Sequence, residues 1–365
     1  MSDPLHWRQL FRLGPAREDH WLGLRCGLGI FLPLFVLLQL DRLDLSLFVV
    51  FAAFTGIYGR VVGHRPRLVR QGQVGAYMLL LILAAALAGW YLVEPVSQLH
   101  GQRAGIWVAV GLTSVVSVIT SVIAGLNRIR PAGSLFQVFA FAAISSLPAG
   151  AAAPLPIGEG MLTAGLTVLL SLLLGQAGRL LPHRRTPWRP VQQAPLDPEA
   201  RRRVWRDAVG YFVAPAGAGI VATLLMPVLG TEFSYWAMVA AVVPLVGQST
   251  RQRVARGVHR VAGTLAGLLL TAGIAALSPH PVATLLLMGL LQFAAEMFIL
   301  RNYFFAQAFV TPLAILGISL THGLDTALLY DRLVETVIGS AVGLAVVVAP
   351  RLLGRARGRA RTRRR

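Results

Sequence analysis

Twelve apolar segments, separated by short polar stretches, constrain the fold of this chain more than any other feature. A helix that crosses the hydrocarbon core of a membrane needs about 20 mostly apolar residues, and about 17 at the least. We expect such helices over residues 22–40, 44–59, 73–93, 104–125, 133–150, 158–181, 207–229, 234–248, 258–277, 281–300, 303–320 and 328–350. Only 13% of the residues are charged, whereas soluble domains carry about 25%. The chain is therefore predicted to be an all-α integral membrane protein with about twelve transmembrane helices.

The arginines predict the orientation of these helices. The chain contains no lysine, so all 34 basic residues are arginine. Arg42, Arg103 and Arg332 fall on one side of the predicted bundle, and the others fall on or near the opposite side. Membrane proteins carry their excess of basic residues in cytoplasmic loops. We therefore expect both termini in the cytoplasm. The first apolar segment lacks a cleavage site of small residues, so we expect it to stay as a helix.

The pattern of the first half of the chain recurs in the second. An offset of 188 residues places Ser46, Ala52, Ala53, Gly59, Arg65 and Gly75 on Ser234, Ala240, Ala241, Gly247, Arg253 and Gly263, and RLLP at 179–182 matches RLLG at 351–354. We expect a six-helix repeat in residues 1–181, a cytoplasmic linker in 182–206, a second six-helix repeat in 207–350 and a polybasic cytoplasmic tail in 351–365. With six helices each, the two repeats would be parallel, and a transport pathway would lie near their interface.

In each half the second predicted span is unusually short, and in the second half Pro244 and Gly247 also interrupt it. A polar stripe marks the segment that follows this short span in the second half. Arg256, Arg260, Thr264, Gly267 and Thr271 share one helix face by their spacing. Small residues such as Gly263 and Gly267 allow two helices to approach closely. The two arginines could attract an anion to this face, or they could snorkel to lipid phosphates as ordinary arginines at a helix end. The residues alone leave both interpretations open.

One carboxylate, Glu296, falls inside an apolar segment, about one turn from its end. A charge deep in a membrane span costs about 2.5–3.5 kcal/mol, so a partner or a function is expected. We expect the partner to be Arg260 or Arg256 on the preceding helix. Such a pair would either hold two helices in register or let Glu296 take up and release a proton.

A polar cluster follows this segment. Arg301, Asn302 and Tyr303 have the residue types of an interfacial turn. Farther on, Thr311 precedes Pro312, and its hydroxyl can bond the backbone group that a proline frees. Together with Gln307, these side chains could also line a path.

These residues resemble a known family. Trp236, the pattern R-x-x-G-T-x-x-G at 260–267 and E-x-x-x-x-R-N-Y followed by T-P at 296–312 are similar to the fusaric acid resistance (FUSC) and aromatic acid exporter family, to which plant aluminium-activated malate transporters are distantly related. The resemblance covers about residues 20–350 and is looser in the first half, where FAAFTGIYGR at 51–60 is the equivalent stretch. It implies an inner-membrane protein that exports aromatic or other organic acids or conducts organic anions. The site residues that it implies are Trp236, Arg260, Gly263, Thr264, Gly267, Glu296, Arg301, Asn302, Tyr303, Thr311 and Pro312.

The chain departs from that family in two respects. Many members carry a large cytoplasmic domain beside the membrane halves, where this chain has only the linker. The first half also lacks a counterpart of Glu296, because Ile123 occupies that place when Arg128 is set against Arg301. The two halves are therefore not expected to do identical work.

We expect a proton-driven exporter of organic acids, aromatic carboxylates above all. Arg260, with Arg256 at the inner mouth, would attract and bind the carboxylate, Trp236 or Tyr303 would pack on the ring, and Glu296 would couple to protons. The alternatives are a passive organic-anion channel and a non-transporting membrane scaffold or envelope-assembly partner. An enzyme is not expected, because HExxH, GxSxG and P-loop motifs are absent from the sequence. Neither a cofactor nor a metal is expected, since no histidine pair has metal-ligand spacing with a carboxylate nearby.

The remaining partners follow from the charge. The polybasic tail should bind anionic lipids, at about 1 kcal/mol per basic residue near the surface. A homo-oligomer and a periplasmic adaptor protein are both compatible with the sequence. Nucleic acid is not expected as a partner, because membrane topology already explains the positive charge.

Overall fold

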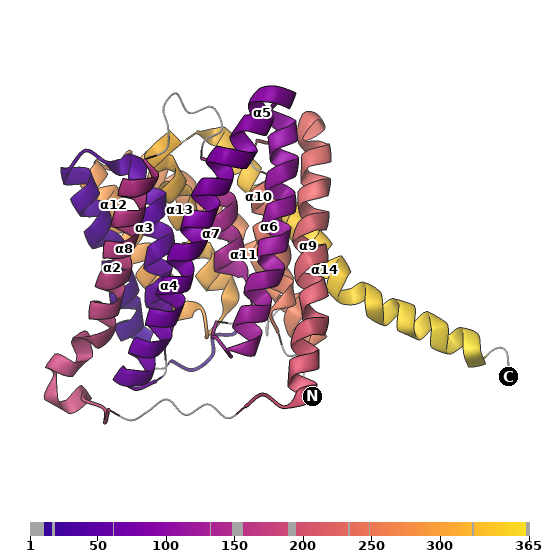
Figure 1. Cartoon of the computed structure of the whole chain (residues 1–365), viewed down its shortest axis with the longest axis horizontal. Coiled ribbons are helices and arrows are strands. Elements are labelled where there is room, and N and C mark those ends of the chain that lie inside the picture. Colours follow the sequence, from indigo (N-terminus) through magenta and orange to yellow (C-terminus); the bar gives the residue numbers. More distant parts are fainter. Residues whose placement is uncertain are drawn as a thin grey trace.

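In the computed structural model, all regular secondary structure of the described residues is helical. The structure describes residues 11–16, 19–60, 62–131, 133–147, 156–188, 195–232, 234–247, 249–322 and 325–362. It describes the side chains of all these residues except 321–322 and 350–362. Parts of the predicted linker (189–194) and tail (363–365) lie outside them. The helices are α2 (Asp19–Gln39), α3 (Ser46–Ala53), α4 (His64–Ala88), α5 (Glu94–His100), α6 (Gln102–Leu126), α7 (Leu135–Ser145), α8 (Ile157–Gln176), α9 (Pro198–Leu229), α10 (Tyr235–Val242), α11 (Thr250–Ala276), α12 (Pro281–Phe298), α13 (Tyr303–His322) and α14 (Thr326–Thr362) (Figure 1).

Nine helical stretches among the described residues are long and apolar enough to cross a membrane. The prediction of an all-α, multi-pass membrane protein is thus confirmed. Three of the twelve predicted spans instead form shorter apolar helices, at 43–57, 135–145 and 235–245. Those at 44–59 and 234–248 were expected to be short. The one expected over 133–150 was not, and α7 covers only Leu135–Ser145.

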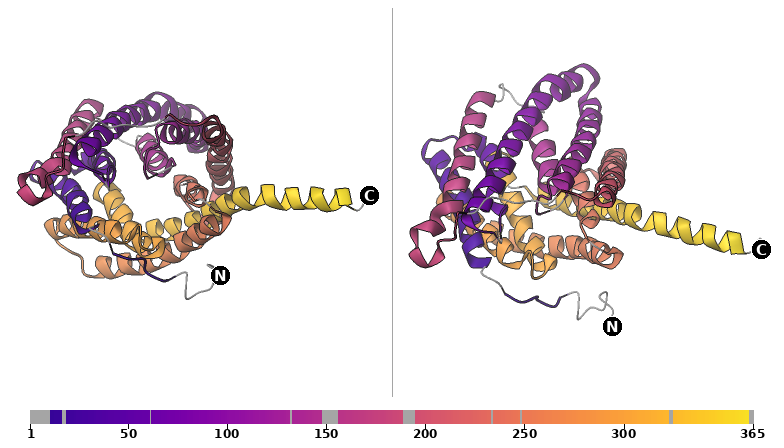
Figure 2. Two further views of the ribbon diagram at one scale, coloured as in Figure 1. Left: turned by 90° about the horizontal axis from the view of Figure 1, so that it is seen from below. Right: turned by 60° about the horizontal axis from the view of Figure 1, so that its bottom comes forward.

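The short helices are short because protein surrounds them. Every residue of α3 and of α10 is buried, and most of α7 is buried as well. Backbone that faces lipid must be helical, but irregular backbone is tolerated at membrane depth where other helices cover it. Seen from its end, the bundle is a ring of long helices, and α7 and α10 lie inside the ring (Figure 2, left). Hydropathy alone cannot make this distinction, because a lipid-facing and a protein-covered helix are equally apolar.

Several helices begin before the apolar segments that predicted them. The helices α4, α9 and α11 begin at His64, Pro198 and Thr250, about eight or nine residues before the expected spans at 73, 207 and 258. Side-chain caps fix two of these ends, because Asp197 accepts from the N–H of Ala200 and Ser249 accepts from the N–H of Gln252. At the other end of the chain, α14 continues to Thr362 and leaves the bundle (Figure 1). Hydropathy marks the membrane part of a helix and misses its polar extension.

Helix contacts in the first half have counterparts in the second. Helix α3 packs on α8 as α10 packs on α14, and α4 packs on α7 as α11 packs on α13. Between the halves, α2 packs on α12 as α6 packs on α9, and α3 meets α13 as α10 meets α7. Two parallel repeats around a common axis would produce these pairings. The division into two six-helix repeats remains a prediction that this packing supports.

Two glycines of the predicted stripe bring α11 against α13. A Cβ atom added to Gly263 would lie 2.7 Å from the Cβ of Gln307 and 2.7 Å from the carbonyl oxygen of Phe304. One turn later, a Cβ atom on Gly267 would lie 2.5 Å from the Cβ of Thr311. Both distances are far below a van der Waals contact, so only glycine permits this approach.

Gly267→Ala is expected to destabilise the bundle, because the new methyl group would push α13 away. Overpacking of this kind costs about 1–3 kcal/mol. Gly273→Ala on the same helix is the matched control, because a Cβ atom there meets nothing within 4 Å. Thermal unfolding of the purified protein in detergent should give a lower midpoint for Gly267→Ala only. Equal midpoints for the two variants would contradict the close α11–α13 contact.

Candidate functional site

A cavity of about 1140 Å³ lies inside the ring of helices. Residues of α3, α4, α7, α10, α11, α12, α13 and α14 line it, together with residues of the segments that follow α3, α6, α10 and α12. Its charged side chains among the described residues are one carboxylate, Glu296, and seven arginines: Arg60, Arg70, Arg128, Arg130, Arg256, Arg260 and Arg332. A cleft with this excess of positive charge concentrates anions.

Five of these arginines lie at one end of the bundle, which we call the Arg-rich end. It is the end where α3, α6 and α12 finish and α4, α11 and α13 begin. The five residues are Arg60, Arg70, Arg128, Arg130 and Arg256. Arg256 lies over the ring of Tyr303, with its guanidinium carbon 5.4 Å from the ring centroid. Arg256 and Tyr303, which were both predicted as site residues, thus lie in the cavity wall.

Arg260 is the best placed of the predicted residues to bind an anion. Its side chain is buried, with an exposed fraction of 2%. Nη1 donates to the side-chain oxygen of Gln307 at 2.7 Å and contacts the hydroxyl of Tyr303 at 3.4 Å. Nε and Nη2 are buried without a hydrogen-bond partner. These two atoms lie on one edge of the guanidinium, the edge that binds a carboxylate through two parallel hydrogen bonds.

Gln307 holds the Arg260 guanidinium in place, because its own amide group is fixed by further hydrogen bonds. Its amide nitrogen donates to the hydroxyls of Thr264 at 3.2 Å and of Thr311 at 2.9 Å. The amide oxygen is thereby turned toward Arg260 and also accepts from the Tyr303 hydroxyl at 3.2 Å. Thr264 and Thr311 therefore act behind the cavity wall and position the amide that holds Arg260.

The role expected for Thr311 at Pro312 is wrong. The Thr311 hydroxyl donates to the carbonyl oxygen of Gln307 at 2.9 Å. Pro312 instead removes the N–H that would bond the carbonyl of Ala308, four residues earlier. That carbonyl faces Gly267. The proline thus leaves a carbonyl at the contact where α11 and α13 approach most closely.

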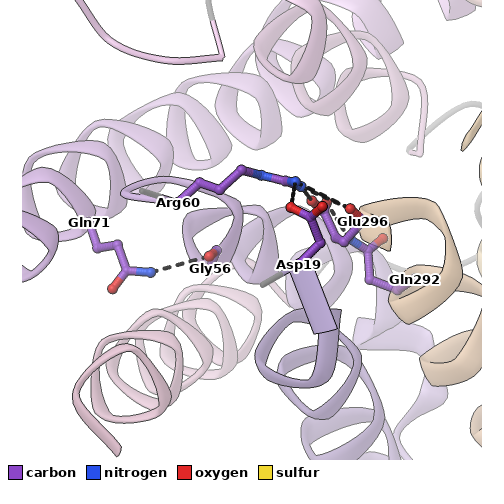
Figure 3. Close-up of polar contacts among 6 residues, drawn as sticks. All are labelled: Asp19, Gly56, Arg60, Gln71, Gln292 and Glu296. Carbon is purple, nitrogen blue, oxygen red and sulfur yellow. Dashed lines mark hydrogen bonds and ion pairs between the residues drawn. The ribbon is translucent and has the colours of Figure 1, made fainter. Parts of the chain in front are cut away.

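The expected partner of Glu296 is also wrong, because neither Arg260 nor Arg256 pairs with it. Arg60, from the first half of the chain, forms an ion pair with the Glu296 carboxylate and another, at 2.9 Å, with Asp19 (Figure 3). Arg60 also donates to the Glu296 carbonyl oxygen at 3.1 Å, and Gln292 donates to the carboxylate at 3.0 Å. This cluster joins α2, the segment that follows α3, and α12. Sequence analysis did not identify the pair of Arg60 and Glu296, because the two residues are 236 positions apart.

Arg301 and Asn302 face away from the cavity. The N–H of Gly14 donates to the carbonyl of Arg301 at 3.0 Å, and the Arg301 side chain donates to the carbonyl of Gly14 at 3.1 Å. Asn302 donates to the carbonyl of Arg12 at 3.2 Å and accepts from the N–H of Phe304 at 2.9 Å. These two residues therefore hold the segment before α2 and begin α13, and neither lines the cavity.

Trp236 is buried behind the cavity wall and does not line it. Its ring lies 5.0 Å from that of Phe139, centroid to centroid, and the guanidinium carbon of Arg332 lies 3.7 Å from its centroid. We expected Arg332 and Asp331 on the outer side, near the start of the last predicted span. They lie near the start of α14, but both are buried, and Arg332 reaches the cavity. A desolvated cation over an aromatic ring gains about 2 kcal/mol or more, which offsets much of the cost of its burial.

Four phenylalanines, which we call the aromatic wall, form an apolar side of the cavity: Phe51, Phe54, Phe136 and Phe139. They pack as two pairs across α3 and α7, with centroids 5.0 Å apart for Phe51 and Phe139 and 4.8 Å apart for Phe54 and Phe136. Sequence reasoning missed this wall. The only signal was FAAFTGIYGR, which holds Phe51, Phe54 and Arg60.

Arg60→Gln is expected to destabilise the protein strongly, because it leaves the buried carboxylates of Asp19 and Glu296 without their cation. Removal of one partner from a buried ion pair costs about 3–5 kcal/mol. Arg65→Gln is the control, because among the described residues Arg65 contacts the exposed Trp188, through its carbonyl and over its ring, and no carboxylate. The free energy of unfolding, from titration with denaturing detergent, should fall for Arg60→Gln only. Adding Glu296→Gln should restore part of the loss, and no recovery would contradict the ion pair.

Comparison with known proteins finds a family resemblance in the C-terminal part of the chain. Residues 221–346 match the model of a family described as fusaric acid resistance protein-like. A stretch of 113 residues is 31% identical to an uncharacterized membrane protein of Bacillus subtilis (strain 168), YvaC, and it covers 30% of this chain and 18% of that protein. No solved structure matches the chain. The predicted resemblance to the fusaric acid resistance family is thus confirmed for residues 221–346, which include Trp236, Arg260 and Glu296.

Proposed function

We propose that the protein exports organic acids across the cell membrane, with aromatic carboxylates as the preferred class. The observation that carries this proposal is the free guanidinium edge of Arg260, buried in a large cavity that also has an aromatic wall. The match to the fusaric acid resistance family supports a transport-related function.

The cavity offers each part of such a substrate a matching surface. Arginines at the Arg-rich end attract the anion, and Arg260 binds the carboxylate through Nε and Nη2. The ring of the substrate packs on the aromatic wall, since aromatic pairs gain about 0.5–1.5 kcal/mol beyond their buried area. Volume is not limiting, because ligand pockets of about 300–1,000 Å³ hold drug-sized molecules.

Glu296 is the group that we propose for proton coupling. Its carboxylate lies in the cavity wall and shares Arg60 with Asp19. Protonation of Glu296 would remove one of the two charges that hold Arg60. The Arg60 guanidinium could then bind an anion at the Arg-rich end. Deprotonation of Glu296 would restore its ion pair with Arg60. The Glu296 carboxylate and the substrate anion would thus compete for one cation, and loss of the proton from Glu296 would displace the anion from Arg60.

Arg260→Gln is expected to weaken saturable benzoate binding. Loss of a buried, charge-assisted contact costs about 2 kcal/mol or more, which raises the Kd roughly thirtyfold or more. Binding of radiolabelled benzoate to the purified protein would be measured beside that of cyclohexanecarboxylate, which has the same charge and similar size but no aromatic ring. The wild type should prefer benzoate.

The control is Arg201→Ala, which removes the same charge from an exposed position on α9. It should bind benzoate as the wild type does. Equal benzoate binding by Arg260→Gln and Arg201→Ala would contradict the proposed role of Arg260. Unchanged resistance of cells to aromatic acids after loss of Arg260 would instead support the scaffold alternative.

Glu296→Gln is expected to uncouple benzoate transport from the proton gradient. In inverted vesicles with an acidic lumen, and with the membrane potential clamped by potassium and valinomycin, the wild type should accumulate benzoate and lose it when a protonophore is added. Glu296→Gln should carry benzoate only down its own gradient, with no response to the protonophore. Glu159→Gln is the control, because that exposed carboxylate pairs with Arg42 at the opposite end of the bundle. Wild-type flux that ignores the protonophore, together with single-channel currents, would identify a passive channel.

A further inference from the structure

Arg332 and Trp236 form a contact that has no cationic counterpart in the first half of the chain. The offset of 188 residues that relates the early parts of the two halves places Phe48 on Trp236. The offset of 172 residues that relates Arg179 to Arg351 places Gly160 on Arg332. The helices agree, since Phe48 and Gly160 lie on the packed pair α3 and α8, and Trp236 and Arg332 lie on the packed pair α10 and α14.

A neighbouring pair of positions confirms that this correspondence is in register. The same two offsets place Asp44 on Glu232 and Glu159 on Asp331. In the first half, Glu159 forms an ion pair with Arg42, in the loop that leads to α3. In the second half, Asp331 accepts from the N–H of Glu232, in the loop that leads to α10, at 2.7 Å. In both halves an acidic residue early in the last helix thus holds the loop before the short helix.

The aromatic rings at these matched positions contact different groups. In the first half, Phe48 packs directly on Gly160, where an added Cβ atom would lie 2.6 Å from the ring. In the second half, a guanidinium covers the ring of Trp236. The fold is built in the first half without a cation, so packing alone does not require Arg332.

The surroundings of Arg332 are those of an anion site. Its exposed fraction is 1%, and it lines the same cavity as Arg260. Nε and Nη1 are buried without a hydrogen-bond partner. Asp331 and Glu335 flank Arg332 on α14 and are as deeply buried, but neither is within ion-pair distance of its guanidinium. Trp236 holds the cation from one face, and Nε and Nη1 remain as donors for a ligand.

The two buried arginines enter the cavity from helices that start at different ends of the bundle. Arg260 is ten residues from the start of α11, which begins at the Arg-rich end, and Arg332 is six residues from the start of α14, which begins at the opposite end. At about 1.5 Å per residue, Arg332 lies roughly 9 Å from that opposite end. An anion that crosses the cavity from the Arg-rich end would reach Arg260 first and Arg332 second.

We propose that Arg332, seated on Trp236, is a second anion subsite of the cavity, which binds a carboxylate after it leaves Arg260. The identity of the anion as an aromatic carboxylate rests on the proposed function. The existence of an anion subsite does not, because it follows from Arg332 and its surroundings.

The test uses fluorine NMR of the full chain with its tryptophans replaced by 5-fluorotryptophan. Trp236→Phe assigns the Trp236 resonance among those of the seven tryptophans. The probes are thiocyanate, a small anion of no aromatic class, and benzoate, both in chloride-free buffer. Each should shift the Trp236 resonance saturably, because binding at Arg332 changes the charge above the indole ring. The exposed Trp205 serves as the internal control and should not shift saturably.

Arg332→Gln should remove the saturable shift for both anions while the other six resonances stay in place, which shows that the fold is intact. Arg332→Lys keeps the charge but loses the planar fork, so the shift should remain with an apparent affinity lowered roughly tenfold, the effect of about 1.4 kcal/mol. A Trp236 shift that survives in Arg332→Gln, or none in the wild type with either anion, would overturn the subsite. A saturable shift with thiocyanate but none with benzoate would preserve the subsite and count against the proposed substrate class.

Discussion

Burial of charge in a membrane-embedded bundle is the constraint on which the site depends. A charged group there loses its hydration and must find another partner in the protein or in a ligand. Arg60 meets this requirement within the protein, because Asp19 and Glu296 hold it from two helices. Arg260 meets it only in part, through the neutral side chains of Gln307 and Tyr303. The first cation thus fastens helices together, while the second keeps one edge free for an anion.

The two halves of the chain share a packing scheme and differ in chemistry. Matching helix pairs build both halves, yet the polar network around Arg260 and the cation over Trp236 lie in the second half. The first half supplies Phe51, Phe54 and Arg60 from α3 and the loop that follows it. Under the proposed function, the second half presents Arg260 to a carboxylate, and the first half presents the aromatic wall. The cavity exists only where the halves meet, which explains why neither half would suffice alone.

Much of the fold was predictable from the sequence, because a helix that faces lipid has a long apolar segment. The short length of α7 was not predictable, because hydropathy does not tell whether lipid or protein surrounds a segment. Arg260, Glu296 and the glycine contacts were found from charge and helical spacing along the chain. The partner of Glu296 and the position of Arg332 were missed, because both depend on contacts between segments that are distant in the sequence. The roles of Arg301 and Asn302 were missed because the segment that they hold, before α2, has no recognisable pattern.

The strength of each anion contact also bears on transport. A carrier must bind its substrate firmly enough to collect it and weakly enough to release it, and several moderate sites achieve this better than one tight site. Nη1 of Arg260 already donates to Gln307 and contacts Tyr303. The face of Trp236 offsets part of the cost of burying the Arg332 charge. Neither arginine offers its full set of donors to a substrate. The neutral and aromatic neighbours therefore serve two purposes, since they offset the burial of each cation and limit its hold on the anion, so that a carboxylate can pass from one end of the cavity to the other.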